Sequence, residues 1–310
     1  MSAHDAIVTI GELTLDDVVV EDLDVDWKQA GGGALYSAIG ASLWSSQSAI
    51  CSTVGPDYPA ALLDELTAAG LDVTAVRRTE ECNSLGLWLL YEASGARHQF
   101  EKSAGGTFAQ LDALRPGAGE LPHTPLGVHL APQSSQGHAA ALADFAHIPA
   151  KLTLDLLTEP YIDTSRYTEP GFLRRVDAFL PSVAEVVDLW GHDDITLLDR
   201  QLSELGFEGT LVIKRGPLGV DVVTAGQVVR VPAAPSTVLD VTGAGDAFCG
   251  GFLAGLIATG GDPVLAAARG VVSSSFVVET RGALNALTSL DPECAAARLN
   301  AVLSSLRRAS

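Results

Sequence analysis

One stretch near the C-terminus joins a carboxylate to a glycine turn. It reads Asp240-Val-Thr-Gly-Ala-Gly-Asp246, so Gly243, Ala244 and Gly245 directly precede an acid. Such a turn, where it runs into a helix, presents unpaired backbone N–H groups at the positive end of the helix dipole and binds anions. An acid beside an anion site weakens plain anion binding. The pattern therefore predicts that chemistry takes place at this turn, although an ordinary strand–turn–helix with an acid in its first turn has the same pattern.

The segments around this stretch must hold the turn in place. Residues 238–241 are predicted as the end of a strand, and the helix after the turn carries Phe248, Phe252 and Leu256 at helical spacing. Elsewhere, short apolar segments alternate with helical ones, which predicts a parallel sheet with helices on both faces. The predicted strands are 6–10, 49–54, 126–131, 151–156, 178–180, 209–214, 219–224 and 227–231. The predicted helices are 34–44, 58–69, 136–147, 170–176, 183–189, 196–205, 263–278 and 292–308.

Two segments interrupt this alternation. Residues 13–25 alternate apolar and acidic side chains at a period near two, as half-exposed strands do. Residues 85–91 and 97–102 flank Glu92-Ala-Ser-Gly95, a sequence typical of a hairpin turn. Together these segments are predicted to form a small separate sheet that covers the main domain as a lid. The main domain then comprises residues 1–11, 30–83 and 104–310, and the lid comprises residues 12–29 and 84–103.

The composition favours a soluble intracellular protein. The 310 residues are 47% hydrophobic, enough for a large core, and carry a formal net charge of −19. This charge argues against nucleic acid and anionic membranes as partners, since both require clustered Lys and Arg. The four cysteines form no Cys-x-x-Cys pair, and the sequence has neither a signal-peptide pattern nor an 18-residue apolar window. We therefore expect a cytoplasmic protein with reduced thiols and no zinc site.

Common nucleotide-binding motifs are absent, but a different family signature is present. The chain has no Walker-type P-loop, and its late glycines do not have the dinucleotide-binding spacing. The Thr-Gly-Ala-Gly-Asp core instead resembles the C-terminal signature of the ribokinase-like (PfkB) carbohydrate kinase family. Further segments resemble that family in order and spacing along nearly the whole chain. They are Gly11-Glu12 with Asp16, Gly31-Gly-Gly33, Val54-Gly55-x-Asp57, Gly70-Leu-Asp72, Val212-Ile-Lys-Arg-Gly216 and Gly219.

The resemblance implies both a fold and a set of site residues. The fold is α/β, a three-layer α/β/α domain with a central, mostly parallel sheet and a small β-sheet lid. Asp246 would accept the proton of an attacking hydroxyl, and the N–H groups of Gly243, Ala244 and Gly245 would hold the phosphoryl charge. The implied substrate positions are Asp16, Gly32, Gly33 and Tyr36. The implied nucleotide and metal positions are Lys214, Gly216 and Gly219 for ATP, Glu185 for Mg2+, and Asp240 and Thr242 for a monovalent cation such as K+.

Some of these residues also have simpler interpretations. Asp16 and Asp17 are neighbours in a predicted strand, so they point to opposite faces, and Asp17 is expected to face solvent. Alternatively, Asp16 and Asp17 are simply two solvated acids of the lid. Ser182 and Glu185 have the spacing of a helix capping box. Lys214 is either a phosphate contact or a solvated side chain.

The chain departs from the family pattern at two positions. Sugar kinases of the family often have an Asn shortly after the glycine pair, where this chain has Tyr36-Ser37. The family often has Asn-x-x-Glu beside the magnesium ion, where this chain retains Glu185 but has Ser182. The Ser182 hydroxyl can still hydrogen bond a metal-bound water. These departures leave the expected reaction unchanged and the identity of the substrate open.

The sequence therefore predicts an ATP- and magnesium-dependent kinase acting on a hydroxyl of a sugar or sugar-like metabolite. Lids of this kind often pair between subunits, so a homodimer through the lid strands is expected. A nucleoside kinase of the same fold, with the lid and the Tyr36 region holding a base, is one alternative. A non-catalytic ligand-sensing protein is another, but a sensor has no need of the acid at Asp246.

Overall fold

The computed structural model describes residues 7–21, 23, 25–92, 97–224 and 226–309. Its strands are β1 (Ile7–Ile10), β2 (Thr14–Val20), β3 (Asp26–Gly31), β4 (Ser48–Val54), β5 (Leu71–Arg78), β6 (Leu87–Tyr91), β7 (Arg97–Glu101), β8 (Gly127–Leu130), β9 (Lys151–Leu154), β10 (Ala178–Phe179), β11 (Thr210–Lys214), β12 (Val220–Thr224) and β13 (Gln227–Val231). Its α-helices are α1 (Gly33–Ser42), α2 (Ala60–Ala68), α3 (Phe108–Leu114), α4 (Ser135–Asp144), α5 (Val183–Trp190), α6 (Ile195–Glu204), α7 (Ala244–Ala258), α8 (Pro263–Val277), α9 (Ala283–Thr288) and α10 (Pro292–Ala309).

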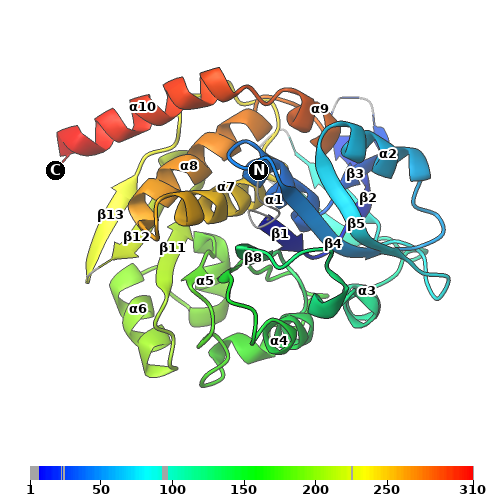
Figure 1. Cartoon of the computed structure of the whole chain (residues 1–310), viewed down its shortest axis with the longest axis horizontal. Helices are drawn as coiled ribbons and strands as arrows, with labels where there is room; N and C mark the ends of the chain where they lie inside the picture. Colours follow the sequence, from blue (N-terminus) through cyan, green and yellow to red (C-terminus); the bar gives the residue numbers. More distant parts are fainter. Residues whose placement is uncertain (1–6, 22, 24, 93–96, 225, 310) are drawn as a thin grey trace.

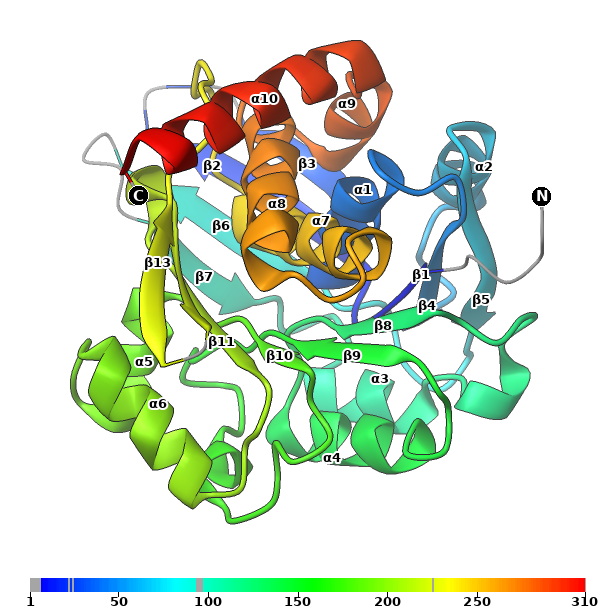
Figure 2. The same cartoon turned by 60° about the vertical axis from the view of Figure 1, so that its left-hand side comes forward.

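A large sheet forms the centre of the molecule. Its order is β13-β12-β11-β10-β9-β8-β1-β4-β5. Neighbouring strands from β5 to β11 are parallel, and β12 and β13 extend the sheet as an antiparallel edge. Helices α1, α2 and α7–α10 cover one face and α3–α6 cover the other (Figure 1, Figure 2). The predicted three-layer α/β/α fold is confirmed.

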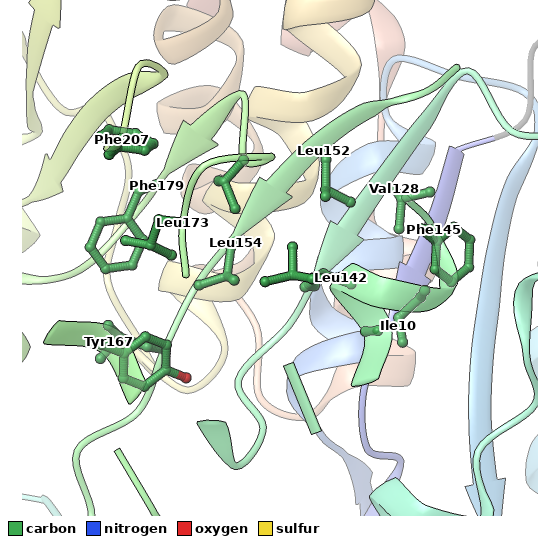
Figure 3. Close-up of a cluster of buried hydrophobic side chains, with 14 of the residues drawn as sticks. Ile10, Val128, Leu142, Phe145, Leu152, Leu154, Tyr167, Leu173, Phe179 and Phe207 are labelled. Carbon is green, nitrogen blue, oxygen red and sulfur yellow. The ribbon is translucent and has the colours of Figure 1, made fainter. Parts of the chain in front are cut away.

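Apolar side chains fill both interfaces between helices and sheet. On the α3–α6 face, Leu142 of α4 and Phe145, directly after that helix, belong to the same buried cluster as Leu152 and Leu154 of β9 (Figure 3). Strands buried on both faces read as continuous apolar runs, which is why the sequence located most of them. No described helix is both long enough and apolar enough to cross a membrane.

Helix α7 packs at very short range between α1 and α8, and glycines make this possible. A Cβ atom at Gly250 would lie 1.8 Å from the carbonyl oxygen of Ser37 on α1. A Cβ atom at Gly255 would lie 2.7 Å from Cα of Ala266 on α8. These approaches exclude any larger residue, so the glycines after the Asp246 turn fix where the start of α7 lies.

The second sheet has the order β3-β2-β6-β7 and comes from the two segments predicted as the lid. Successive side chains along its strands point to opposite faces of the sheet. Asp16 and Leu89 line a cavity on the inner face, whereas Asp17 and Trp88 are paired on the outer face. The prediction that Asp17 faces solvent is wrong. Its carboxylate is buried, ion-paired with Nζ of Lys102 at 2.8 Å, and accepts the backbone N–H of Lys28 at 2.8 Å.

Several predicted elements differ from the structure. Residues 170–176 form successive turns and no helix, because Gly171 has φ +80° and its N–H bonds to Leu205 O. Residues 238–241 are not a strand, and the N–H groups of Leu239 and Asp240 bond instead to Val278 O at the end of α8. Strand β3 lies beyond the predicted strand segment 13–25, and strand β5 and helices α3 and α9 were not predicted. Most of the predicted turn at 92–95, and residues 1–6, lie outside the described residues.

Candidate active site

The site lies at the carboxyl ends of the parallel strands, beneath the second sheet. Binding sites of open α/β sheets are typically found at this edge. A cavity of about 330 Å³ occupies this edge. Its lining residues come from the segment after β1, from β2, β6 and β7, from the starts of α1, α3, α5 and α7, and from the ends of β9 and β11. Among them are Glu12, Asp16, Gly32, Gly33, Tyr36, Leu87, Leu89, Gln99, Phe108, Asp155, Glu185, Lys214, Thr242, Gly243, Gly245 and Asp246.

The predicted anion turn has the geometry that the sequence indicated. Gly243 is the N-cap of α7 with φ +71°, a left-handed conformation that favours glycine, and Asp246 lies in the first turn. A Cβ atom at Gly243 would lie 2.1 Å from Cγ of the Tyr36 ring, so the ring packs directly on the turn. A Cβ atom at Gly33 would lie 2.9 Å from Oδ1 of Asp246. The structure thus brings the glycine pair, Tyr36 and Asp246 together.

A second cavity, of about 460 Å³, lies on the other side of the same turn. Its walls are mostly apolar and include Val220, Ala234, Val238, Phe248, Val271 and Val278. The two cavities share Lys214, Gly216, Val241 and Gly245. A polar cavity and an apolar cavity therefore meet at the N-terminus of α7.

Asp16 is the acid of the second sheet that faces the polar cavity. Its side chain is 4% exposed, and its Oδ1 has no hydrogen-bond partner among the described residues. Burial raises the pKa of Asp16 to about 7. A buried carboxylate oxygen without a partner is costly, so a hydroxyl of a bound ligand would satisfy it. Glu12, also buried in this cavity, has an unpartnered Oε2, and burial together with Asp112 raises its pKa well above the usual value.

Lys214, Gly216 and Gly219 line the apolar cavity. Lys214 ends β11 and forms an ion pair with Asp155, at the end of β9. Gly216 has φ +55° and faces both cavities, whereas a Cβ atom at Gly219 would lie 2.1 Å from a carbonyl oxygen of β13. Arg215 turns away from the site and pairs with Asp221. Of the two adjacent cations, only Lys214 therefore lines the cavities.

Glu185 lies at the start of α5 and lines the polar cavity. Its Oε2 accepts the Ser182 N–H at 2.6 Å, and Ser182 Oγ accepts the Glu185 N–H at 3.3 Å. The capping box is therefore present. It uses Oε2 of Glu185 and does not use Oε1, the other carboxylate oxygen. Among the described residues, no three His, Cys, Asp or Glu side chains cluster as a metal site. A magnesium ion would fit as one held by Glu185, waters and nucleotide phosphates, the usual mode for this ion.

Asp240 and Thr242 form a compact turn just before Gly243. The N–H and Oγ1 of Thr242 donate to Asp240 Oδ1 at 2.9 and 2.6 Å. The hydroxyl of Tyr91, at the end of β6, is hydrogen bonded to Thr242 Oγ1. These oxygens are of the type that K+ prefers, but they already bond to one another.

Sequence reasoning missed some residues of the site. Asp155 follows a buried apolar strand at the edge where Asp246 lies, and this position is a signal that would have identified it. Phe108 and Gln99 belong to a helix that was not predicted and to the inner face of β7. Their place in the cavity depends on how the second sheet folds over the first, which no local pattern encodes.

The fold is similar to those of solved ribokinase-like kinases. A nucleoside kinase from Burkholderia thailandensis, solved in complex with inosine, has a TM-score of 0.76 at 20% identity and covers 96% of this chain and 99% of that chain. An Arabidopsis thaliana ribokinase complexed with ribose and ATP has a TM-score of 0.73 at 16% identity, with 96% and 99% coverage. At these identities the likeness concerns the fold.

Sequence comparison identifies the family. A cytidine kinase from Thermococcus kodakarensis is 26% identical over 80% of this chain and 87% of its own length. A fructokinase from Klebsiella pneumoniae is 33% identical over 43% of this chain, a match that spans about half (48%) of that relative. Residues 6–290 match the profile described as pfkB family carbohydrate kinase. The chain belongs to the pfkB family of carbohydrate kinases.

Proposed function

We propose that the protein is an ATP-dependent kinase that transfers the γ-phosphoryl group to a hydroxyl of a sugar or sugar-like metabolite. The observation that carries this proposal is the meeting of two cavities at the Asp246 turn, one polar and one apolar. Kinases must hold a donor and an acceptor in line across a site that stabilises phosphoryl charge. Family membership supports the same reaction class.

In this proposal the acceptor hydroxyl lies beside Asp246, which takes its proton as the oxygen attacks the γ-phosphorus. The N–H groups of Gly243, Ala244 and Gly245 hold the charge on the transferring group, aided by the dipole of the 15-residue helix α7. Gly33, whose missing Cβ would lie 2.9 Å from Asp246 Oδ1, leaves space for the acceptor at this point. Asp16 and Gly32 bind the other hydroxyls of the acceptor.

ATP occupies the apolar cavity, with its base against the α8 side chains and its phosphates directed to the shared wall. Gly216 belongs to that wall, and Gly219 lines the apolar cavity next to it. Magnesium, when bound, neutralises phosphate charge and is held through Glu185. Asp240 and Thr242 are proposed ligands for K+, which would have to displace the Tyr91 hydroxyl from Thr242.

The acceptor is proposed to be uncharged. The acids lining the polar cavity are Glu12, Asp16, Asp155, Glu185 and Asp246. Among the described residues that line this cavity, Lys214 is the single cationic side chain, and it is already paired with Asp155. A sugar acid or sugar phosphate would bring its own negative charge next to these carboxylates, which is unfavourable in a partly buried site. Hydroxyl groups, in contrast, can donate to them.

A nucleoside is the second candidate, and one wall of the cavity favours it. Leu87 and Leu89 of β6 and Phe108 of α3 are apolar, and Gln99 lies beside them. Gln99 Nε2 donates to Tyr161 Oη at 2.7 Å, which leaves its carbonyl oxygen for a ligand. A planar base suits apolar walls with one polar contact. Sugar hydroxyls facing these leucines would lack partners.

The proposed assembly is a homodimer joined through the outer face of the second sheet, in the cytoplasm. Trp27 is 60% and Phe100 52% exposed on this face, and Trp27 contacts Trp88 edge to face at 5.8 Å between ring centroids. Exposed aromatic side chains of this size are typical of interfaces. The described cysteines are free thiols, as expected of a reducing compartment.

Release of ADP measured against a panel of sugars, polyols, sugar acids and nucleosides tests the proposal. We expect turnover with uncharged sugars or nucleosides and none with sugar acids. Turnover only with sugar acids would contradict the charge argument. No turnover with any acceptor, while ATP still binds, would favour a ligand-sensing protein over a kinase.

A further inference from the structure

The side chain of Lys214 lies at the junction of the two cavities. Lys214 lines both cavities. Among the described residues that line either cavity, it is the single cationic side chain. The carboxylates of Asp155, Glu185 and Asp246 line the polar cavity around the same junction. A nucleotide triphosphate brought there would meet three acids, and the repulsion must be offset by fixed positive charge.

Lys214 is aimed at the anion turn. A Cβ atom at Gly245 would lie 3.5 Å from Lys214 Nζ, so the ammonium group lies just beside the N–H groups of the turn. Nζ is paired with Asp155 Oδ2 and lies 3.8 Å from Cys249 Sγ. An ammonium group has three N–H donors. Asp155 and Cys249 take two of these donors, so the third N–H of Lys214 can reach a group bound at the turn.

Asp155 holds the ammonium group in this position. Its side chain is 2% exposed; Oδ1 accepts the Leu156 N–H at 2.9 Å and Oδ2 pairs with Lys214. The carboxylate is thereby fixed by its own backbone at the end of β9. Burial alone would lower the pKa of Lys214, but the Asp155 carboxylate outweighs this and raises it, so the side chain stays charged.

Stability alone does not account for this pair. A buried ion pair gains little over well-packed apolar side chains, because both charges lose their hydration. On the α7 side, the pair packs against Cys249, whose side chain is fully buried. A charge kept at a cavity junction instead points to a ligand.

We propose that Lys214 is a catalytic residue that contacts the transferred γ-phosphoryl group, and that Asp155 is a positioning residue that holds it there. This inference rests on the proposed kinase function. In the step itself, the acceptor oxygen bonds to the γ-phosphorus while the bond from that phosphorus to the β,γ-bridging oxygen breaks. ADP leaves with the electron pair of that bond, the acceptor proton passes to Asp246, and Lys214 neither gains nor loses a proton.

The test compares ATP with ADP, because only ATP carries the γ-phosphate. Dissociation constants of both nucleotides are measured by calorimetry without magnesium, in EDTA, for the wild type and Lys214→Met. We expect the ratio Kd(ADP)/Kd(ATP) to be at least about tenfold lower in the variant than in the wild type, which is the range for loss of a charge-assisted hydrogen bond. We expect its kcat to fall by about 10²- to 10³-fold. An unchanged ratio with folded protein would overturn the proposal.

Lys151→Met is the matched control, since Lys151 also pairs with an aspartate, Asp177, but at the opposite end of β9. It should change neither the ratio nor kcat. Lys214→Arg should keep part of the ATP preference, and this second variant keeps the proposal testable if Lys214→Met fails to fold. Asp155→Asn should lower the ratio at least about threefold, a change that a merely structural role would not produce. If the wild type binds no ATP the kinase function fails, whereas an active wild type with unaltered variants removes only this inference.

Discussion

The hydroxyl of Tyr91 is hydrogen bonded to the hydroxyl of Thr242, which joins the second sheet to the turn that begins the active site. Thr242 donates in turn to Asp240 Oδ1 at 2.6 Å. Since Thr242 uses its proton for Asp240, its oxygen accepts the proton of Tyr91. The direction of both bonds is thereby fixed, and the position of the second sheet is linked to that of Gly243 one residue later.

Loss of this bond should loosen the second sheet over the acceptor. We predict that Tyr91→Phe raises the acceptor KM about three- to tenfold, the net worth of one hydrogen bond, and leaves the Kd for ATP unchanged. Steady-state kinetics and calorimetry measure the two quantities. Tyr58→Phe is the control, because the buried Tyr58 hydroxyl has no described partner. Equal effects of the two variants would contradict the role given to Tyr91.

Asp16 should make acceptor binding depend on pH. Burial raises the pKa of Asp16 to about 7, so the free enzyme holds a neutral carboxyl group below that pH and a carboxylate above it. A carboxylate accepts hydroxyl protons more strongly than a neutral carboxyl group does. We predict that the acceptor KM rises as pH falls through about 7, and that Asp16→Asn binds acceptor weakly without this inflection. The same inflection in the variant would assign it to another group.

The same shift affects folding stability. Because the folded pKa of about 7 lies above the ordinary value of 3.8, the folded chain keeps a proton that the unfolded chain has lost between these values. The contribution of Asp16 to stability therefore falls as pH rises from about 4 to about 7. Asp16→Asn should flatten this part of the free energy of unfolding measured in urea. A slope as steep as in the wild type would contradict the assignment.

Gly243→Ala should damage the anion turn through steric conflict as well as backbone strain. The position has φ +71°, and an added Cβ would lie 2.1 Å from the Tyr36 ring. We predict at least about a 10²-fold loss of kcat/KM, comparable to the loss of one anion-binding donor. Gly191→Ala, at φ +75° with open space around it, isolates the strain and should keep near wild-type activity. Similar losses in both variants would show that strain alone is responsible.

The outer face of the second sheet should control assembly. We predict that the wild type is a dimer in light scattering and that Phe100→Glu dissociates it, because a charge would replace an exposed aromatic side chain at the proposed interface. Val228→Glu, an exposed apolar position on the far edge strand β13, is the control and should leave the dimer intact. A monomeric wild type would refute the proposed assembly.

Much of this fold follows from local sequence patterns. Strands such as β4 and β8 are buried along their whole length and consist mostly of apolar or small side chains, so they were located within a residue or two. The apolar segment at 238–241 misled the prediction because Val238 and Val241 are more than half exposed and border a cavity. Apolar residues that line a ligand site mimic a buried strand, and periodicity cannot separate the two.

The site was predictable only where its residues are neighbours in the chain. Asp246 and its glycine turn are contiguous, so backbone chemistry alone indicated an anion site. The Lys214–Asp155 pair joins residues 59 positions apart, and the Tyr91–Thr242 bond joins residues 151 positions apart. Neither is encoded in any local pattern. Both depend on which strands lie side by side and on how the second sheet covers the first.

Asp246 is the residue that we propose accepts the proton of the acceptor hydroxyl. Asp246→Asn keeps the size and shape of the side chain but removes the base, so turnover with the best acceptor should fall below a few per cent of the wild type. The Kd for ATP should stay near the wild-type value, because the N–H groups of the turn are unchanged. An Asn variant that binds ATP normally and keeps more than a few per cent of wild-type turnover would contradict the account.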